Sequence, residues 1–166
     1  MIDTTRPNRL ARALGKLDKL PGFVRPWVRN RVLRRAVPLT GTTRLQYVQL
    51  TPQRVEMTVA NTRRVQNHIG GVHAAAMALL AETATGFVVG MNVPDDKVPV
   101  IKTMKVDFQR RAVGALKAVA SLQAGQITLM QEQDKGETIV SVVITDESGQ
   151  QPIQAEMLWA WVPKRR

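Results

Sequence analysis

The sequence predicts a single α+β domain in which a six-stranded antiparallel sheet wraps one long helix. Its 166 residues are enough for one domain with a full hydrophobic core. Residues 72–91 are apolar on nearly all sides, as expected of a buried helix, and contain a single carboxylate, Glu82. Segments of strand-like alternation come before and after this helix, which favours a sheet packed around it over a helical bundle.

Two strands are expected before the helix, at 44–51 and 54–60, and four after it, around 104–108, 116–122, 138–145 and 153–161. In the second strand Val55, Met57 and Val59 alternate with polar residues. The segment 138–145 is mostly β-branched, and a turn at 146–149 separates it from the last strand. The segment 125–134 is compatible with a short helix or with a continued strand.

The first 40 residues form a basic extension to a main domain at 41–166. They hold ten Arg or Lys and two Asp, so they carry +8 of the net charge of +11. Leucines from Leu10 to Leu20 have helical spacing, and Pro26 begins a second helix in which Val24, Trp27, Val28 and Val32 can share a face. These basic amphipathic helices either cover the core, which we favour, or make a weak contact with an anionic membrane.

Several classes of function are disfavoured by composition. With no cysteine there is no disulfide or thiolate site, and the two histidines lie in one loop, so we expect no metal site. The basic start lacks the apolar core of a secretion signal, so a cytoplasmic location is expected. Glu82 argues against a membrane-spanning helix. Few aromatic residues lie between the basic ones, so nucleic acid is not an expected partner.

A motif at the start of the long helix resembles a known family. Asn67-His-Ile-Gly-Gly-Val-His73, the run Ala74-Ala-Ala-Met-Ala-Leu-Leu-Ala, and Glu82 nine residues after His73 resemble the signature of hotdog-fold acyl-CoA thioesterases of the phenylacetate-pathway type. The motif and the N-terminal helices are closer still to an uncharacterised hotdog group. Two departures from the family pattern are Ala74-Ala75 in place of a glycine pair and Gly86 in place of Ser or Thr.

The resemblance implies hydrolysis of an acyl- or aroyl-CoA thioester, with coenzyme A as part of the substrate and no separate cofactor. Glu82 would be the base or nucleophile, its basicity raised by apolar surroundings. The backbone N–H of Ala74 would hold the developing oxyanion at the helix N-terminus. Asn67 would position water or the carbonyl, and His73 would orient the thioester or assist the departing thiolate.

Other side chains are candidates for binding substrate. They are His68 and Gly71 in the loop, Thr83 beside the acid, Thr103 on the following strand, and Arg110 and Arg111, which could bind CoA phosphates. Structural explanations stand beside these roles. Glu82 could hydrogen-bond loop backbone, His73 could simply begin the helix, and Asn67 and Gly71 could serve only a tight turn.

Helix geometry adds a constraint. The nine residues from His73 to Glu82 span about 13–14 Å and end on the opposite face of the helix, so Glu82 cannot reach the oxyanion donor of its own helix. If the two groups act together, they belong to two chains related by a twofold axis. The mechanism therefore predicts a homodimer, alone or within a dimer of dimers.

Two other functions remain as alternatives. One is a hotdog hydratase or dehydratase that uses His68 and Glu82, although the Pro and Gly residues that accompany that motif are missing. The other is a non-catalytic protein that binds acyl-CoA or a membrane surface through its basic N-terminus.

Overall fold

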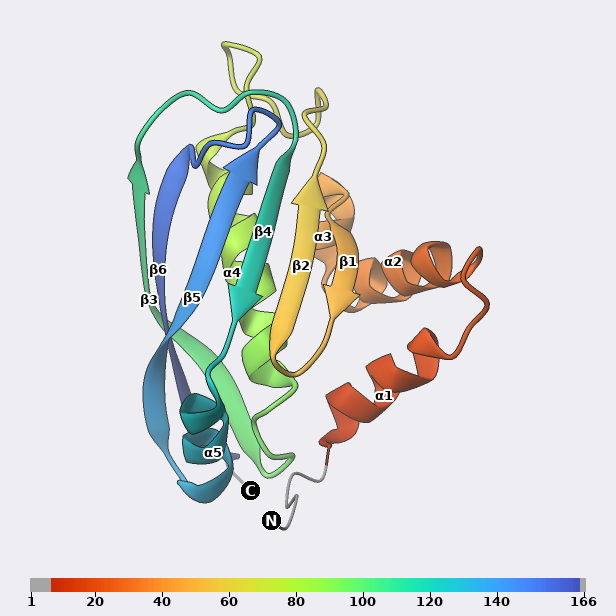
Figure 1. The fold of residues 1–166 in the computed structure, drawn as a ribbon, viewed down its shortest axis with the longest axis vertical. Coiled ribbons are helices and arrows are strands. Elements are labelled where there is room, and N and C mark those ends of the chain that lie inside the picture. The colour runs from red at the N-terminus through yellow and green to blue at the C-terminus, as the bar shows by residue number, and fades with distance from the viewer. Residues whose placement is uncertain (1–6, 165–166) are drawn as a thin grey trace.

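The computed structural model describes residues 7–164 and has the predicted α+β architecture (Figure 1). The long helix α4 is wrapped by a curved sheet, and the remaining helices lie at the margins of that sheet. This is the hotdog fold. The elements in chain order are α1 (Arg9–Asp18), α2 (Arg25–Ala36), α3 (Pro38–Thr43), β1 (Gln46–Leu50), β2 (Arg54–Val59), α4 (Ala74–Gly90), β3 (Lys97–Phe108), β4 (Leu116–Ser121), α5 (Ala124–Glu132), β5 (Gly136–Asp146) and β6 (Ile153–Pro163).

The sheet confirms the six predicted strands, in the order β1-β2-β4-β5-β6-β3, with every neighbouring pair antiparallel. β3 is longer than expected because it pairs with β6 from Lys97 to Phe108. Its other edge has no neighbouring strand among residues 7–164, and β1 forms the opposite edge of the sheet. A strand edge of this length leaves a row of backbone donors and acceptors available for pairing.

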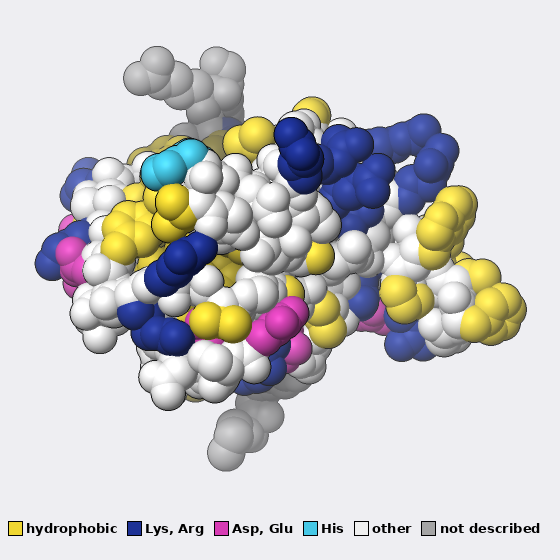
Figure 2. Space-filling view, turned by 90° about the horizontal axis from the view of Figure 1, so that it is seen from above, with side chains coloured by type: hydrophobic (Ala, Val, Ile, Leu, Met, Phe, Trp, Pro, Cys, Tyr) yellow, Lys and Arg dark blue, Asp and Glu magenta, His cyan; other side chains and the backbone are white. Residues whose placement is uncertain are grey.

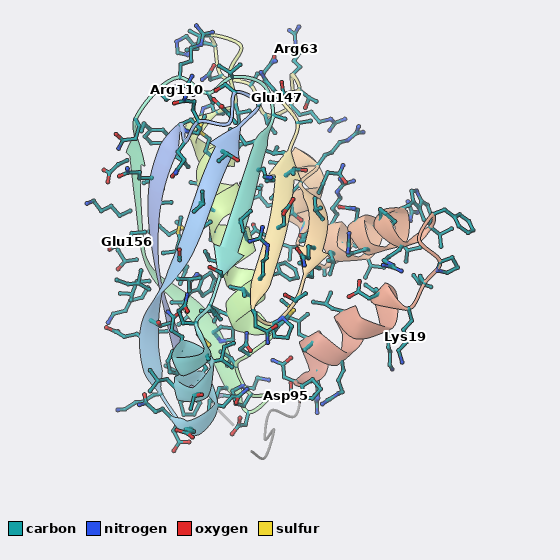
Figure 3. All side chains as sticks on the ribbon, viewed as in Figure 1. Lys19, Arg63, Asp95, Arg110, Glu147 and Glu156 are labelled. Atoms are coloured by element: carbon teal, nitrogen blue, oxygen red, sulfur yellow. The ribbon has the colours of Figure 1, made fainter. Side chains whose placement is uncertain are left out.

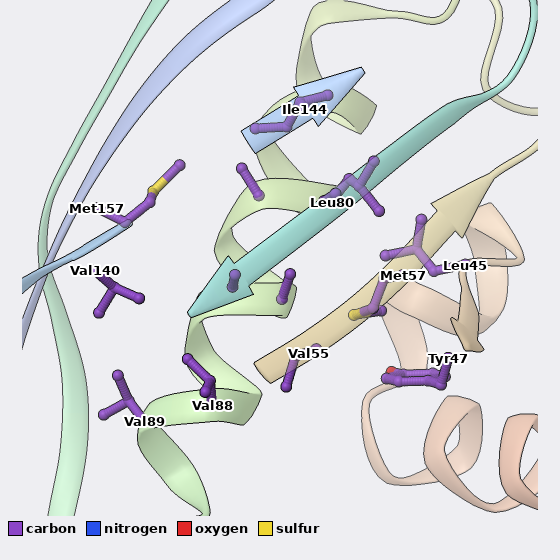
Figure 4. Close-up of a cluster of buried hydrophobic side chains, with 14 of the residues drawn as sticks. Leu45, Tyr47, Val55, Met57, Leu80, Val88, Val89, Val140, Ile144 and Met157 are labelled. Atoms are coloured by element: carbon purple, nitrogen blue, oxygen red, sulfur yellow. The ribbon is translucent and has the colours of Figure 1, made fainter. Parts of the chain in front are cut away.

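The core lies between α4 and the concave face of the sheet (Figure 4). Leu80, Ala84 and Val88 of α4 are fully buried against β2, β4 and β6. The other side of α4, which includes Ala78, Leu79 and Glu82, is only partly covered. The helix therefore has one face fixed in the core and one face towards the outside of the chain.

The apolar side of β3 is also uncovered. The register places Met104 opposite Met157 and Phe108 opposite Ile153, so these side chains lie on the same face of the sheet as α4. Yet Met104 is 52% exposed and Phe108 is 55% exposed, whereas their partners on β6 are buried. The apolar strip of β3 thus lies on the helix side of the sheet, and no other residue that the structure describes covers it.

The two N-terminal helices differ in how they pack. α1 covers the core as expected: Leu14 is buried, and Asn8 caps the helix while its amide donates to the carbonyls of Gly90 and Val93. The apolar face expected for α2 is wrong, because its buried residues are Arg29, Asn30 and Leu33. The physical reason is that Arg29 and Asn30 hydrogen-bond the backbone of β1.

The ambiguous segment after β4 is a helix, α5. Gln123 and Gln126 form a capping box at its start, a signal that favours a helix over a continued strand. Across residues 7–164, no helix is long and apolar enough to cross a membrane. In the same range, acidic and histidine side chains form no cluster of three that could hold a metal ion.

Candidate active site

The loop before α4 is a tight turn organised by Asn67. Its side-chain oxygen accepts from the backbone N–H of Ile69 and of Gly71, both at 3.1 Å, and its carbonyl accepts from Gly70. Gly70 has a φ of +78°, which glycine adopts at little cost. Asn67 therefore stabilises the turn. Because its side-chain oxygen binds the N–H groups of Ile69 and Gly71, it fixes the point where the chain enters α4.

His73 is the N-cap residue of α4. Its Nδ1 accepts from the backbone N–H of Ala75 at 3.0 Å, which leaves the proton of the neutral ring on Nε2. The carbonyl of His73 accepts from Ala76 and Met77. Ala74 comes first in the helix, is exposed, and its N–H has no acceptor among residues 7–164. This donor at the positive end of α4 is the one that the resemblance assigns to the oxyanion.

Glu82 lies two turns further along, on the less covered side of α4. Burial raises the pKa of its carboxyl group above the usual value, and a hydrogen bond from the Thr83 hydroxyl at 3.3 Å partly opposes this. A raised pKa suits a group that takes up a proton near neutral pH. Among residues 7–164, the Glu82 carboxylate hydrogen-bonds only to the side chain of Thr83 and not to loop backbone.

The absence of Ser or Thr at position 86 has a steric explanation. A Cβ at Gly86 would lie 2.9 Å from Cη2 of Trp159, whose indole fills that space. The indole N–H donates to Thr85 at 2.9 Å, so the Thr85 hydroxyl is used in the core. Of the two threonines on either side of this helix turn, Thr83 and Thr85, only Thr83 donates to the carboxylate of Glu82.

Ala74 and Glu82 do not meet within one chain. Eight residues separate them on a continuous helix, or about 12 Å along its axis. The side of α4 that holds Glu82 also presents Ala75, Ala78 and Leu79, which are exposed or partly exposed. The Glu82 carboxylate and the Ala74 N–H of one chain therefore lie at two separate points along α4.

The proposed substrate-binding residues are dispersed. His68 is exposed and Gly71 is buried in the turn. Arg111 donates to the carbonyl of Ile69, which keeps its side chain beside the loop. Arg63 and Arg110 both lie at the upper end of the molecule (Figure 3), where the loop precedes α4. Thr103 pairs with Leu158 on the sheet face away from α4, so its own chain does not bring it to Glu82.

Sequence reasoning missed the role of Asp146. Its buried carboxylate accepts from Arg110 at 2.9 Å, from the backbone of Val113 at 3.0 Å, and from both the backbone and the hydroxyl of Ser148. Burial opposes ionisation, but the hydrogen bonds from Ser148, Val113 and Gln150 outweigh it and lower the pKa to about 2. The turn signal at 146–149 was visible in the sequence, but nothing local indicated that Asp146 would hold a distant arginine.

Comparison with known proteins agrees with this fold. No curated protein matched the chain significantly. Among solved structures, a protein of unknown function from Pseudomonas aeruginosa, PA5026, described as a probable thioesterase, is 24% identical, with a TM-score of 0.74 over 87% of this chain and 97% of that one. Thioesterase HI1161 from Haemophilus influenzae is 14% identical, with a TM-score of 0.62 over 75% of this chain and 82% of that one.

A third similar structure is a mutant of thioesterase PA1618 from Pseudomonas aeruginosa, 14% identical, with a TM-score of 0.67 over 81% of this chain and 94% of that one. These likenesses establish the shared fold. A family model also matches residues 25–162, from α2 to the last strand. The chain therefore belongs to the family described as a domain of unknown function, DUF4442.

Proposed function

We propose that this protein hydrolyses the thioester of an acyl- or aroyl-CoA in a site formed between two copies of the chain. The observation that carries the proposal is the pair of groups on the open face of α4. Glu82 is a half-buried acid with a raised pKa, and the N–H of Ala74 is a helix N-terminal donor without an acceptor in residues 7–164. Together they match the two requirements of thioester hydrolysis, a base and an oxyanion donor.

The surfaces around α4 support a dimer. The unpaired edge of β3 and its exposed Met104 and Phe108 adjoin the open helix face that presents Leu79 and Glu82. A twofold axis beside this edge would extend the sheet, cover the apolar strip and bring the two α4 helices together antiparallel. Glu82 of each chain would then face the Ala74 N–H of the other.

In the proposed reaction a water molecule attacks the thioester carbon. Glu82 accepts a proton from this water as the new C–O bond forms, and the Ala74 N–H donates to the carbonyl oxygen as it gains negative charge. Collapse of the tetrahedral intermediate breaks the C–S bond and expels the thiolate, which takes up the proton. His73, whose Nε2 proton is set by the cap on Nδ1, could supply a hydrogen bond to the departing sulfur.

The comparisons support this activity at the level of reaction type, because three similar structures are described as thioesterases, one of them only as probable. The phenylacetate-pathway subgroup stays a prediction. A hydratase that uses His68 is less well supported, since His68 is exposed in the turn rather than placed beside Glu82 along α4. A non-catalytic acyl-CoA binder would have no need for a desolvated carboxylate opposite an oxyanion donor.

The test is thiol release from a panel of acyl- and aroyl-CoA substrates. Glu82→Gln keeps the size of the side chain but removes the base, and we expect kcat to fall about 10²–10⁴-fold. Glu156→Gln, an exposed acid on β6, is the matched control and should retain activity. Absence of hydrolysis with any substrate, or equal activity of Glu82→Gln and the control, would contradict the proposal.

A further inference from the structure

The outer face of α2 is an unexpected surface. The residues expected to form its buried apolar face are largely exposed: Trp27 is 66% exposed and Val32 is 46% exposed. Phe23, in the turn just before the helix, is 87% exposed. Large aromatic side chains are costly to leave in water. The exposure of two of them at the tip of the hairpin formed by α1 and α2 therefore calls for an explanation.

The exposure of these aromatic side chains results from contacts made by the opposite face of α2. Arg29 donates to the carbonyl of Val48 at 2.6 Å, and the side-chain oxygen of Asn30 accepts from the N–H of Tyr47 at 2.8 Å. Asp18 of α1 lies 3.7 Å from the Arg29 guanidinium. These contacts with β1 and α1 fix the rotation of α2. Trp27 could turn towards the core only if they broke.

The exposed aromatic residues continue into a basic stripe. Trp27, Arg31 and Arg35 follow one another at four-residue spacing, and the Arg31 guanidinium lies over the Trp27 ring, 5.6 Å from its centroid. The side chains of Arg31 and Arg35 make no hydrogen bond or ion pair with another described residue. Figure 2 shows Lys and Arg side chains gathered beside hydrophobic ones where the hairpin projects from the body.

The chain segment that carries this stripe has charges of one sign. From Lys19 to Arg54 the sequence contains eight Arg or Lys and no Asp or Glu. An open hollow of about 520 Å³ lies beside α2, large enough for a phosphate headgroup. Its lining includes the Trp27 ring and three guanidinium groups together with two amide side chains: Trp27, Arg31, Arg34, Arg35, Asn30 and Gln46.

We propose that the outer face of α2, with the turn before it, docks on an anionic phospholipid bilayer. Trp27 enters the headgroup region, where its amphipathic ring is favoured, the apolar ring of Phe23 enters beside it, and Arg31 and Arg35 contact lipid phosphates. A second copy of this chain is a poor occupant, since twofold pairing would bring equal positive charges together. Nucleic acid is disfavoured because the two aromatic residues form a projecting tip, without a groove of interleaved stacking residues.

Trp27 makes the proposal directly measurable. The other two tryptophans, Trp159 and Trp161, are buried, so brominated lipid should quench Trp27 selectively. Full-length protein is sedimented with vesicles of phosphatidylcholine alone or with about one-third phosphatidylglycerol. We expect binding only to the anionic vesicles, weakened by salt, with bromolipid quenching that is lost in Trp27→Phe.

The charge contribution is tested with a pair of double variants. Each Arg near an anionic surface contributes about fivefold in affinity, so Arg31→Gln with Arg35→Gln should weaken binding about 25-fold. Lys117→Gln with Lys135→Gln removes the same charge from exposed positions elsewhere and should change binding little. Thermal unfolding and thioester hydrolysis of each variant verify that the fold is intact, and they separate this proposal from the one on activity.

Three results would overturn the proposal. The first is no sedimentation with anionic vesicles at low salt. The second is an equal loss in both double variants, which would indicate attraction by net charge alone. The third is vesicle binding without quenching of Trp27. Retardation of an oligonucleotide that depends on Arg31 and Arg35, without vesicle binding, would assign the stripe to nucleic acid instead.

Discussion

Replacement of Asp146 by Asn should destabilise the fold in a way that depends on pH. The folded pKa of about 2 lies below the ordinary value of 3.8, a difference worth about 2 kcal/mol. Because the folded pKa is lowered, this contribution is complete above about pH 4 and is lost as pH falls towards 2. The NH₂ group of Asn would also face two donors, the Arg110 guanidinium and the Val113 N–H, which further lowers stability.

The assay is thermal and urea unfolding of wild type and Asp146→Asn at fixed protein concentration, from pH 7 down to pH 2.5. At pH 7 we expect Asp146→Asn to lower the free energy of unfolding by at least about 2 kcal/mol, or Tm by about 4–8 °C. This difference from wild type should shrink below about pH 4. Asp107→Asn is the matched control, since that carboxylate is exposed and paired with Lys105 at 3.6 Å, and it should change stability by less than about 0.5 kcal/mol. A difference for Asp146→Asn that stays the same at pH 7 and pH 2.5 would refute the reasoning.

Three other substitutions follow from the site. Glu82→Gln should raise Tm at pH 7 although it slows hydrolysis. The Tm rises because the folded pKa of Glu82 is raised, so ionisation of this carboxyl group destabilises the fold as pH increases; equal Tm shifts at pH 4 and pH 7 would contradict this. Gly86→Ala should lower Tm despite its better helix propensity, because the new Cβ would lie 2.9 Å from the Trp159 ring; an increase in Tm would show that the indole moves freely. Asn67→Ala should lower the free energy of unfolding by about 1–2 kcal/mol and weaken catalysis, because the turn before α4 loses two hydrogen bonds. An unchanged urea midpoint would show that Asn67 does not stabilise the turn.

The part of the fold that the sequence predicts well is the part with strong periodicity. The apolar helix and the alternating strands stand out because their side chains are sorted by a single buried face. The helix α2 was predicted, but its buried face was predicted incorrectly, for the opposite reason. Arg29 and Asn30 are buried there because β1 offers them backbone partners, and no pattern within 25–36 reveals that distant strand.

The candidate site likewise has features that local sequence predicts and features that it does not. The turn at Asn67, the helix start at His73 and the isolated acid at Glu82 depend on local sequence, and each lies where the motif places it. Long-range contacts could not be predicted. Trp159 explains Gly86 and Asp146 holds Arg110, but each pair is separated by more than thirty residues and meets only through the sheet.

The central claim is that each active site takes its acid from one chain and its oxyanion donor from the other. Ala74→Pro tests the donor with little risk to folding, because proline suits the first position of a helix and His73 already has an extended backbone (φ −65°, ψ 142°). Alone, Ala74→Pro should lower kcat about 10²–10³-fold, as loss of one oxyanion donor does.

Co-expression of Ala74→Pro and Glu82→Gln chains with different tags is the most direct measurement. In a mixed dimer one site keeps both functional groups, so random pairing should restore about a quarter of wild-type thioester hydrolysis, all of it in the doubly tagged fraction. If the purified mixed species is no more active than either variant alone, the acid and the donor do not act across a dimer, and the proposed site is wrong.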